Sequence, residues 1–236
     1  MTQEKRKPAA LPVYLQISEF LIREIAAGRL ADGERLPPER EMAKQYNTSV
    51  RTLRKSLLQL IKAGLLKSVQ GSGNYIQSNH RAQSIYSMFR LELNTGGGLP
   101  SAQILEISLS KKPDTIPQFG TSKSGNRIRR LRFLNEFPIA IEEIWLDHDC
   151  GDVNLNEISD SLYRYYQRKL GLLITRAIDK VSIDKVPGWS PKGFGLSSNE
   201  TTSLVERMSW AQQPDPVEYS RTWFDTRLAS YVQRIT

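Results

Sequence analysis

Apolar residues recur at three- and four-residue steps near the start of the chain, with polar residues between them. The stripe comprises Leu15, Ile17, Phe20, Leu21 and Ile25. This spacing gives a helix one apolar face, so the pattern predicts a helix over residues 13–27. Gly28 follows directly, in the position where a glycine commonly ends a helix.

Two further helices are predicted by start signals and by a second apolar stripe. The dipeptide Pro38-Glu39 suits the first turn of a helix that runs to about Tyr46, because proline is tolerated there and a carboxylate favours that end of the helix dipole. Ser49 is a good N-cap for the next helix, and Gly64 would end it. The predicted inner face of this third helix holds Leu53, Leu57, Leu60 and Ile61.

The opposite face of the third helix is basic. Arg51, Arg54 and Lys55 are spaced i, i+3 and i+4, so they share one side, with Ser49 and Thr52 near its beginning. Two short strands, 65–69 and 74–77, are expected around a glycine-rich tip at 71–73. Helix, turn, basic helix and glycine-tipped hairpin predict a winged helix-turn-helix that binds DNA. The alternative is an ordinary solvated helix face.

The distribution of charge supports the DNA interpretation. Residues 1–80 hold 13 lysines and arginines against 7 acidic residues, whereas residues 81–236 hold 20 against 18. Excess positive charge in one part of a chain of 236 residues is expected when one domain meets phosphate and another does not. The single cysteine, Cys150, excludes an internal disulfide framework, and we expect a cytoplasmic protein because no signal peptide or long apolar run is evident.

The stretch from Pro12 to Ile76 resembles the DNA-binding domain of the GntR family of bacterial transcription regulators. The shared motifs are Pro12-x-Tyr14-x-Gln16-Ile17, Gly28-x-Leu30-x-x-Gly33-x-x-Leu36-Pro37, Glu39-Arg40, Arg54, Leu57, Leu60, Gly64-Leu65 and Gln70-Gly71-x-Gly73. The resemblance implies that the residues facing double-stranded, palindromic operator DNA are Arg40, Ser49, Arg51, Thr52, Arg54, Lys55, Gln70, Gly71 and Ser72.

One position departs from the family pattern. The family usually has Arg-Thr-Thr after the serine, whereas this chain has Val50-Arg51-Thr52. A shift of one residue turns a helical side chain by about 100°, so the usual base contact is not carried over to Val50. Val50 could instead touch a thymine methyl group. We therefore expect an operator that differs from the family consensus.

The rest of the chain predicts a linker and a second domain. The DNA-binding domain is assigned to residues 8–77, the linker to 78–90 and the second domain to 91–236, in which glycines 96–98 form a loop. Strands are expected at 128–134, 137–146, 176–186, 204–210 and 217–224, with a helix at 162–170. Two of the predicted hairpins repeat a pattern 78 positions apart: Pro138, Trp145 and Asp147 match Pro216, Trp223 and Asp225. The repeat suggests two similar halves of one antiparallel sheet, with a ligand between them, although chance matching is the alternative.

This second part resembles the UTRA domain, the effector-binding module of the HutC branch of the GntR family. The matching residues are Arg130-Leu131-Arg132, Pro138-Ile139-x-x-Glu142, Ser161-Leu162-Tyr163, Leu196 before Leu204, and Pro216-Val217-Glu218-Tyr219. The resemblance implies an α+β chain: an N-terminal winged helix-turn-helix followed by an antiparallel-sheet effector domain with the fold of chorismate lyase. It also implies a homodimer.

The same resemblance implies an effector site. Arg130 and Arg132 would bind an acidic or phosphate group through their planar forks of donors, and Arg176 would add a cation. Glu142 and Glu218 would accept hydrogen bonds, whereas Ser161 and Tyr163 would contribute hydroxyls. Other readings stay open: the two arginines could form cross-strand salt bridges to Glu142 or Glu143, and the tyrosines and tryptophans could simply be core.

A metal site and an active site are weaker hypotheses. The run from Asp147 to Asp152 holds possible ligands, but neighbouring strand residues alternate faces, so few could converge, and we expect neither a metal nor a cofactor. We predict a non-enzymatic transcription regulator, more often a repressor than an activator. A small metabolite, anionic such as a sugar phosphate or an organic acid, would control its operator affinity. The alternatives are a regulator whose second domain only dimerises and a lyase-like enzyme.

Overall fold

The computed structural model describes residues 12–26, 28–77, 90–96, 98–154, 157–158 and 162–233. The chain divides into two compact units whose boundary falls between Leu91 and Glu92, with Tyr231 and the residues after it grouped with the first unit. Each unit is described by itself. The predicted linker lies outside the described residues, apart from Arg90.

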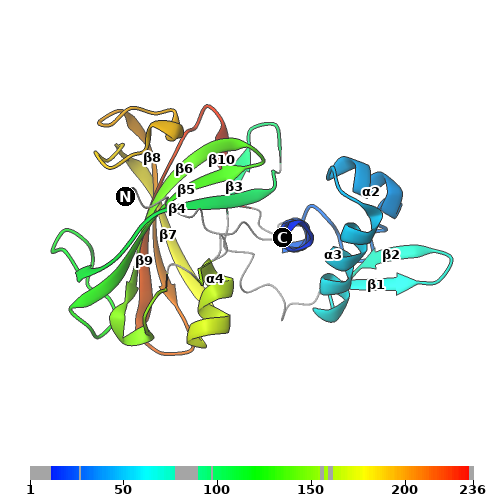
Figure 1. Cartoon of the computed structure of the whole chain (residues 1–236), viewed down its shortest axis with the longest axis horizontal. Coiled ribbons are helices and arrows are strands. Elements are labelled where there is room, and N and C mark those ends of the chain that lie inside the picture. The colour runs from blue at the N-terminus through cyan, green and yellow to red at the C-terminus, as the bar shows by residue number, and fades with distance from the viewer. Residues whose placement is uncertain are drawn as a thin grey trace, which may run out of the picture. The chain divides into compact units, whose positions relative to one another are not determined.

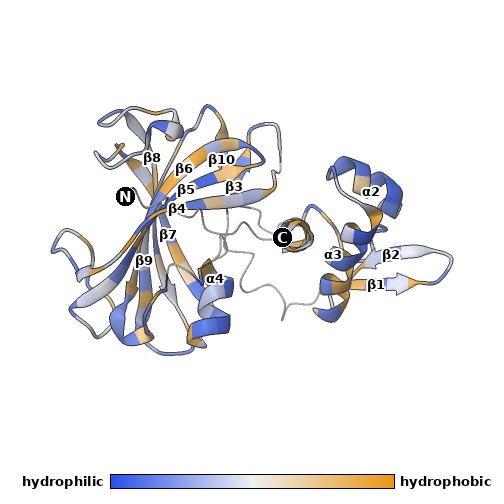
Figure 2. Cartoon of the chain, in the orientation of Figure 1, coloured by the Kyte–Doolittle hydropathy of each residue, from blue (hydrophilic) through white to orange (hydrophobic). Residues whose placement is uncertain are grey.

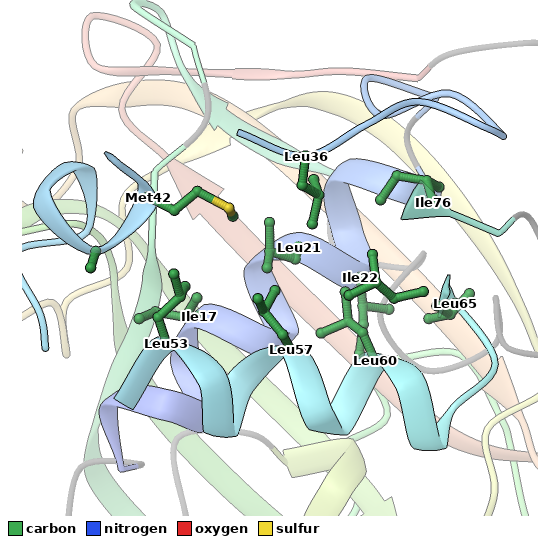
Figure 3. Packing of buried hydrophobic residues seen from close by; sticks show 12 residues of the cluster. Ile17, Leu21, Ile22, Leu36, Met42, Leu53, Leu57, Leu60, Leu65 and Ile76 are labelled. Atoms are coloured by element: carbon green, nitrogen blue, oxygen red, sulfur yellow. The ribbon is translucent and has the colours of Figure 1, made fainter. Parts of the chain in front are cut away.

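The first unit consists of three helices and a hairpin. They are α1 (Val13–Ala26), α2 (Glu39–Gln45), α3 (Val50–Lys62), β1 (Leu66–Val69) and β2 (Gly73–Ile76). Ile17, Leu21, Leu53 and Leu57 fill the space between α1 and α3, as Figure 3 shows. Burying a side chain of this size contributes about 1.5–3 kcal/mol. The core therefore fixes the angle at which α3 presents its outer face.

The helix-turn-helix elements follow the predicted bounds closely, but one core residue was misplaced. Ile61 is 37% exposed, and Ser56 is buried in the stripe instead. Ile61 lies eight residues after Leu53, which turns it about 80° away from that residue at 100° per position. It therefore falls at the margin of the apolar face. The actual inner face is Leu53, Ser56, Leu57 and Leu60.

The second unit is built on one large antiparallel sheet (Figure 1). Its strands are β4 (Pro100–Lys111), β5 (Ser124–Leu134), β6 (Phe137–Asp147), β7 (Arg176–Lys185), β8 (Thr201–Trp210) and β9 (Pro216–Phe224). Their spatial order is β4-β5-β6-β9-β8-β7, so β4 and β7 are the two edges. A separate pair joins β3 (Leu91–Leu93) and β10 (Ala229–Tyr231).

Short helical segments complete this unit. They are η2 (His148–Cys150), α4 (Leu162–Tyr165), the π-helical turn η3 (Tyr166–Leu170) and η4 (Lys192–Phe194). The helix expected at 162–170 is thus α4 continued by η3. The five expected strands are all present, and β4 was not predicted.

The two predicted hairpins lie next to each other in this sheet. Glu143 of β6 pairs with Arg221 of β9, which lies 78 residues later. Trp223 pairs with Ile141, and Trp145 pairs with Tyr219, so an approximate two-fold axis between Glu143 and Arg221 exchanges the two tryptophans. The repeat seen in the sequence therefore corresponds to two halves of one sheet. Because β6 and β9 are directly paired, a ligand cannot lie between these strands.

The two faces of the sheet differ in what covers them. One face packs against the 112–121 and 186–199 segments, through apolar clusters that include Phe119 with Tyr219 and Phe194 with Trp223. The other face carries Glu142, Arg130 and Glu218, and Tyr163 of α4 lies against it. Figure 2 shows hydrophobic residues alternating with polar ones along these strands. We call the second surface the α4-covered face.

Candidate DNA interface and effector cluster

The beginning of α3, the helix with the basic outer face, is fixed by a side-chain cap. The Ser49 hydroxyl accepts a hydrogen bond from the Thr52 backbone N–H at 3.1 Å and lies 2.8 Å from the Thr52 hydroxyl. Such a cap satisfies one of the N–H groups that a helix start leaves without a partner. Ser49 therefore has a structural role as well as an exposed position beside the predicted base-reading residues.

The predicted DNA-facing cations lie on the surface of the first unit. Arg40, Arg51, Arg54 and Lys55 are all exposed. Arg54 Nε donates to Glu39 at 2.7 Å, while the Lys55 ammonium lies 5.9 Å from the centre of the Tyr14 ring. An exposed ion pair such as Arg54–Glu39 contributes less than about 1 kcal/mol, so a phosphate can displace it at little cost.

The wing hairpin has a glycine-dependent tip. Gly71 and Gly73 have φ angles of 74° and 131°, which side chains rarely adopt. A Cβ at Gly73 would lie 3.1 Å from Arg35 Nε. Ser72 is held by a 2.6 Å hydrogen bond with the Tyr75 hydroxyl, whereas Gln70 is exposed. The tip can therefore approach a sugar-phosphate backbone closely.

Two residues on this surface were not identified from the sequence as candidates for DNA contact. Leu58 is 50% exposed and lies four residues after Arg54, on the basic face of α3. Arg35 forms a β-bridge with Tyr75 and brings a guanidinium beside the wing. The position of Arg35 depends on the pairing of residues 33–36 with strand β2 of the wing, which no local sequence pattern indicates. Val50, in contrast, packs against the domain core, which favours packing over the proposed thymine contact.

On the α4-covered face, three of the predicted effector residues form one charged group. Arg130 Nε donates to Glu142 at 2.9 Å, and Arg132 Nη1 donates to the other carboxylate oxygen at 2.8 Å. Arg130 and Glu142 stand opposite each other on β5 and β6, and all three side chains are largely buried. The salt bridge that the sequence offered as the alternative therefore exists, with the two arginines fixed side by side.

Burial and charge act against each other at this group. Burial alone would raise the pKa of Glu142, but the positive charges of Arg130 and Arg132 and their hydrogen bonds lower it to about 2. Burial also lowers the pKa of Arg132, whereas the negative charge of Glu142 acts to raise it. Glu142 is thus ionised at neutral pH and supplies the negative charge that both buried guanidinium groups contact.

A second group on this face holds the predicted residues Tyr163 and Glu218 together with Ser209, which was not predicted. The Tyr163 hydroxyl donates to Glu218 at 2.9 Å, and Ser209 donates to the same carboxylate oxygen at 3.1 Å. Burial raises the pKa of Glu218, and the hydroxyl donors only partly offset it. Glu218 is therefore closer to its protonated form than Glu142 is, and it can act as a hydrogen-bonding group towards a ligand.

A third group links the first two and was missed by the sequence analysis. Arg207 of β8 donates to both oxygens of Asp179 on β7, at 2.6 and 2.7 Å. The positive charge of Arg207 acts to lower the pKa of Arg132 and that of Tyr163. Asp179 and Arg207 stand opposite each other in register, which only the strand pairing reveals. We define the effector cluster as the following side chains: Arg130, Arg132, Glu142, Tyr163, Asp179, Arg207, Ser209 and Glu218.

Two predicted effector residues are not placed in this cluster. Arg176 is paired with Trp210, and its guanidinium carbon lies 4.1 Å from the centre of the Trp210 ring. Because Arg176 is three residues before Asp179 on β7, strand alternation directs it to the opposite face of the sheet. Ser161 lies outside the described residues.

A winged helix-turn-helix with an exposed basic helix, followed by a unit whose buried arginines and hydroxyls converge, defines a class: DNA-binding regulators with a ligand-sensing domain. Residues 13–76 match the description "Bacterial regulatory proteins, gntR family", and residues 96–228 match the UTRA domain. The chain belongs to the GntR family of transcription regulators and carries a UTRA domain. The members it resembles are regulators rather than enzymes.

Three related proteins illustrate the match. The chain is 50% identical over 232 residues to the HTH-type transcriptional regulator SmoD of Agrobacterium fabrum, covering 98% of this chain and 99% of that one. It is 25% identical to the repressor NagR of Bacillus subtilis, over 92% and 91% of the two chains. The mannosyl-D-glycerate transport/metabolism system repressor MngR of Escherichia coli is 26% identical, over 91% and 92%.

A solved structure supports the fold. The possible transcriptional regulator YydK from Bacillus subtilis matches 96% of this chain and 100% of its own, with a TM-score of 0.53 and 20% identity. Within the part of the chain that the structure describes, no helix is long and apolar enough to cross a membrane.

Proposed function

We propose that the protein is a homodimeric repressor that binds a palindromic operator and releases it when an anionic metabolite occupies the effector cluster. Residues 8–77 form the DNA-binding domain, 78–90 connect it to the rest, and 91–236 bind the effector and dimerise. A regulator of chromosomal genes would act in the bacterial cytoplasm.

The observation that carries the effector proposal is the buried group formed by Arg130, Arg132 and Glu142. Replacing such a group by apolar residues is often neutral or stabilising, so its presence is poorly explained by stability alone. Two guanidinium groups held in fixed positions provide fork-shaped donors that suit phosphate or carboxylate. The nearby Glu218, Ser209 and Tyr163 would hydrogen-bond the hydroxyls of a sugar or hydroxy acid.

The names of the relatives agree with this proposal. NagR and MngR are named as repressors, and MngR is named for a mannosyl-D-glycerate system, a compound that joins a sugar to a carboxylate. We therefore rank sugar phosphates and sugar-linked acids above neutral sugars as effectors of this protein.

Operator binding can be tested on DNA fragments taken from around the protein's own gene. Footprinting should show two protected half-sites of inverted symmetry, about one or two helical turns apart. Addition of the effector should release the protein and abolish the footprint. Protection of a single half-site would contradict the dimeric reading, and release by no member of a broad anion panel would favour a second domain that only dimerises.

A further inference from the structure

The two edges of the large sheet differ in a way that points to an interface. β4 begins with Pro100 and contains a bulge between Ile104 and Glu106. Proline and bulges are features that keep an edge strand from pairing with another chain. β7 is ten residues long and its pairing with β8 is unbroken from Arg176 to Lys185.

β7 also exposes apolar side chains. Ile178, Val181 and Ile183 are 51%, 54% and 76% exposed, and every residue from Lys180 to Lys185 is exposed. A long, regular edge strand with exposed β-branched residues readily pairs with another strand. The described part of the chain supplies no such strand, because β7 ends the order of the sheet.

The sequence of β7 fits a second copy of itself. We propose that two copies of this chain join their sheets by antiparallel pairing of β7 with β7, with Ser182 opposite Ser182. In this register Val181 faces Ile183 of the second copy, Lys180 faces Asp184, and Asp179 faces Lys185. The two-fold axis repeats each contact, so the charges at 179, 180, 184 and 185 each meet an opposite charge, and Val181 meets Ile183. The remaining charge of β7, Arg176, lies outside this run, because its counterpart in the register is Gly188, beyond the end of the strand.

Other registers are much less favourable. A shift of one residue in one direction puts Asp179 opposite Asp184, and in the other direction it puts Lys180 opposite Lys185. Like charges directly opposite each other destabilise a sheet. Shifts by two residues set Asp179 opposite Ile183, or Val181 opposite Lys185. Of these five registers, only pairing about Ser182 matches both charge and hydrophobicity.

The same pairing continues a charge pattern that already crosses the sheet. Successive strands place Glu106, Arg129, Glu143, Arg221, Glu206 and Lys180 opposite one another, with alternating sign from β4 to β7. Lys180 is the last charge of this row and lies at the open edge. Asp184 of the second copy would be the next charge, again of opposite sign.

This inference names the surface for the dimer contained in the proposed function, and so rests on it. It also places both α4-covered faces on the same side of a continuous sheet, because the two-fold axis is perpendicular to the sheet. Occupation of one effector cluster could then be sensed by the other through β7, since Asp179 belongs both to the cluster and to the proposed interface.

A charge-exchange experiment on the full-length chain tests the register. Lys180→Glu and Asp184→Lys each put like charges opposite each other twice, so either variant alone should dissociate about tenfold more readily in sedimentation equilibrium. When the two variants are mixed, a heterodimer regains both opposite-charge pairs, and dimers should reappear. Dimers of each single variant as stable as the wild type would overturn the proposal.

A cysteine pair provides a second test that does not depend on loss of binding. In a Cys150→Ser background, Ser182→Cys should form an intermolecular disulfide on mild oxidation, because residues opposite each other in a sheet are within bonding range. Lys180→Cys is the matched control: its two copies would be four residues apart along the strand, about 13 Å, and should not cross-link.

The outcomes separate this inference from the function it builds on. A wild-type dimer that binds a palindromic site but cross-links no better through Ser182→Cys than through Lys180→Cys would overturn β7 as the interface and leave the proposed function intact. A wild-type monomer that binds a single half-site would overturn both.

Discussion

The candidate functional arginines differ in burial between the two units of this protein: they are exposed in the first and buried in the second. Arg54 on α3 has 66% of its side chain exposed and one partly exposed carboxylate partner, Glu39. Arg130 in the sheet has 6% of its side chain exposed and shares Glu142 with Arg132. An exposed, loosely held cation suits a long polyanion that is met along a surface, whereas a buried, fixed pair suits one small ligand.

The difference in burial also determines how much each ion pair contributes to stability. Removing a partner from an exposed pair costs little, because water replaces it. Removing a partner from a buried group leaves an uncompensated charge in the interior. The same chemical change is therefore expected to have quite different consequences in the two units.

The largest expected effect is on the stability of the second unit. Glu142→Ala leaves Arg130 and Arg132 without their shared carboxylate, and should lower the free energy of unfolding by about 3–5 kcal/mol. Glu39→Ala, the matched change in the first unit, should cost less than about 1 kcal/mol. Urea denaturation measures both, and equal costs would contradict the comparison.

The pH dependence of stability should follow from the same group. The pKa of Glu142 is about 2 in the folded protein and near 4.5 in the unfolded chain. A lowered carboxyl pKa stabilises the fold fully above about pH 4.5, and this contribution is lost as the pH falls towards 2. It amounts to up to about 3 kcal/mol. Urea midpoints between pH 7 and 3 should fall more steeply in the wild type than in Glu142→Gln.

Glu218 should contribute with the opposite sign. Its pKa is raised, so ionisation disfavours the folded state and stability from this group increases as the pH falls through the raised value. Glu218→Gln should therefore be no less stable than the wild type near pH 7. A clear loss of stability at pH 7 would show that the ionised carboxylate is held more favourably than its contacts suggest.

Operator affinity should depend on Arg54 without any change in the second unit. Arg54→Ala should weaken operator binding by about 1–3 kcal/mol, that is, roughly five- to 150-fold. Arg168→Ala, which removes an exposed arginine from the second unit, is the matched control and should bind as the wild type does. Fluorescence anisotropy at one fixed salt concentration measures both.

A smaller effect is expected at the start of α3. Ser49→Ala removes the cap on Thr52 and should cost about 0.5–2 kcal/mol of stability. Ser49→Asp can accept the same hydrogen bond, and should restore stability while weakening DNA binding by its negative charge. If the aspartate variant bound operator as well as the wild type, Ser49 would not lie at the interface.

The sequence predicted the first unit better than the second for a physical reason. A helix carries its pattern locally, so the cap at Ser49, the stripe of Leu53, Leu57 and Leu60, and the outer cations could be read from spacing alone. Ile61 failed because an apolar residue at the margin of a stripe can lie on either side of it.

In the sheet, the decisive neighbours are far apart along the chain. The pairing of Arg130 with Glu142 lies within one hairpin and could be suggested as a cross-strand contact. The Arg207–Asp179 pair and the position of Arg176 depend on the register of β7 with β8, which no local pattern specifies. The sequence repeat at a spacing of 78 residues correctly indicated two similar halves of the sheet. It could not show that the halves join through the pairing of β6 with β9.

The central claim, that the second unit senses an anion through its buried arginines, is tested most directly by thermal shift. The wild type, Arg132→Ala and Arg129→Ala would be screened against sugar phosphates, sugar-linked acids and neutral sugars. Arg129 lies on the same strand but on the opposite face, so it controls for the loss of a paired arginine. We predict that an anionic compound raises the melting temperature of the wild type and Arg129→Ala but not of Arg132→Ala. A compound that stabilises Arg132→Ala as much as the wild type would contradict the claim.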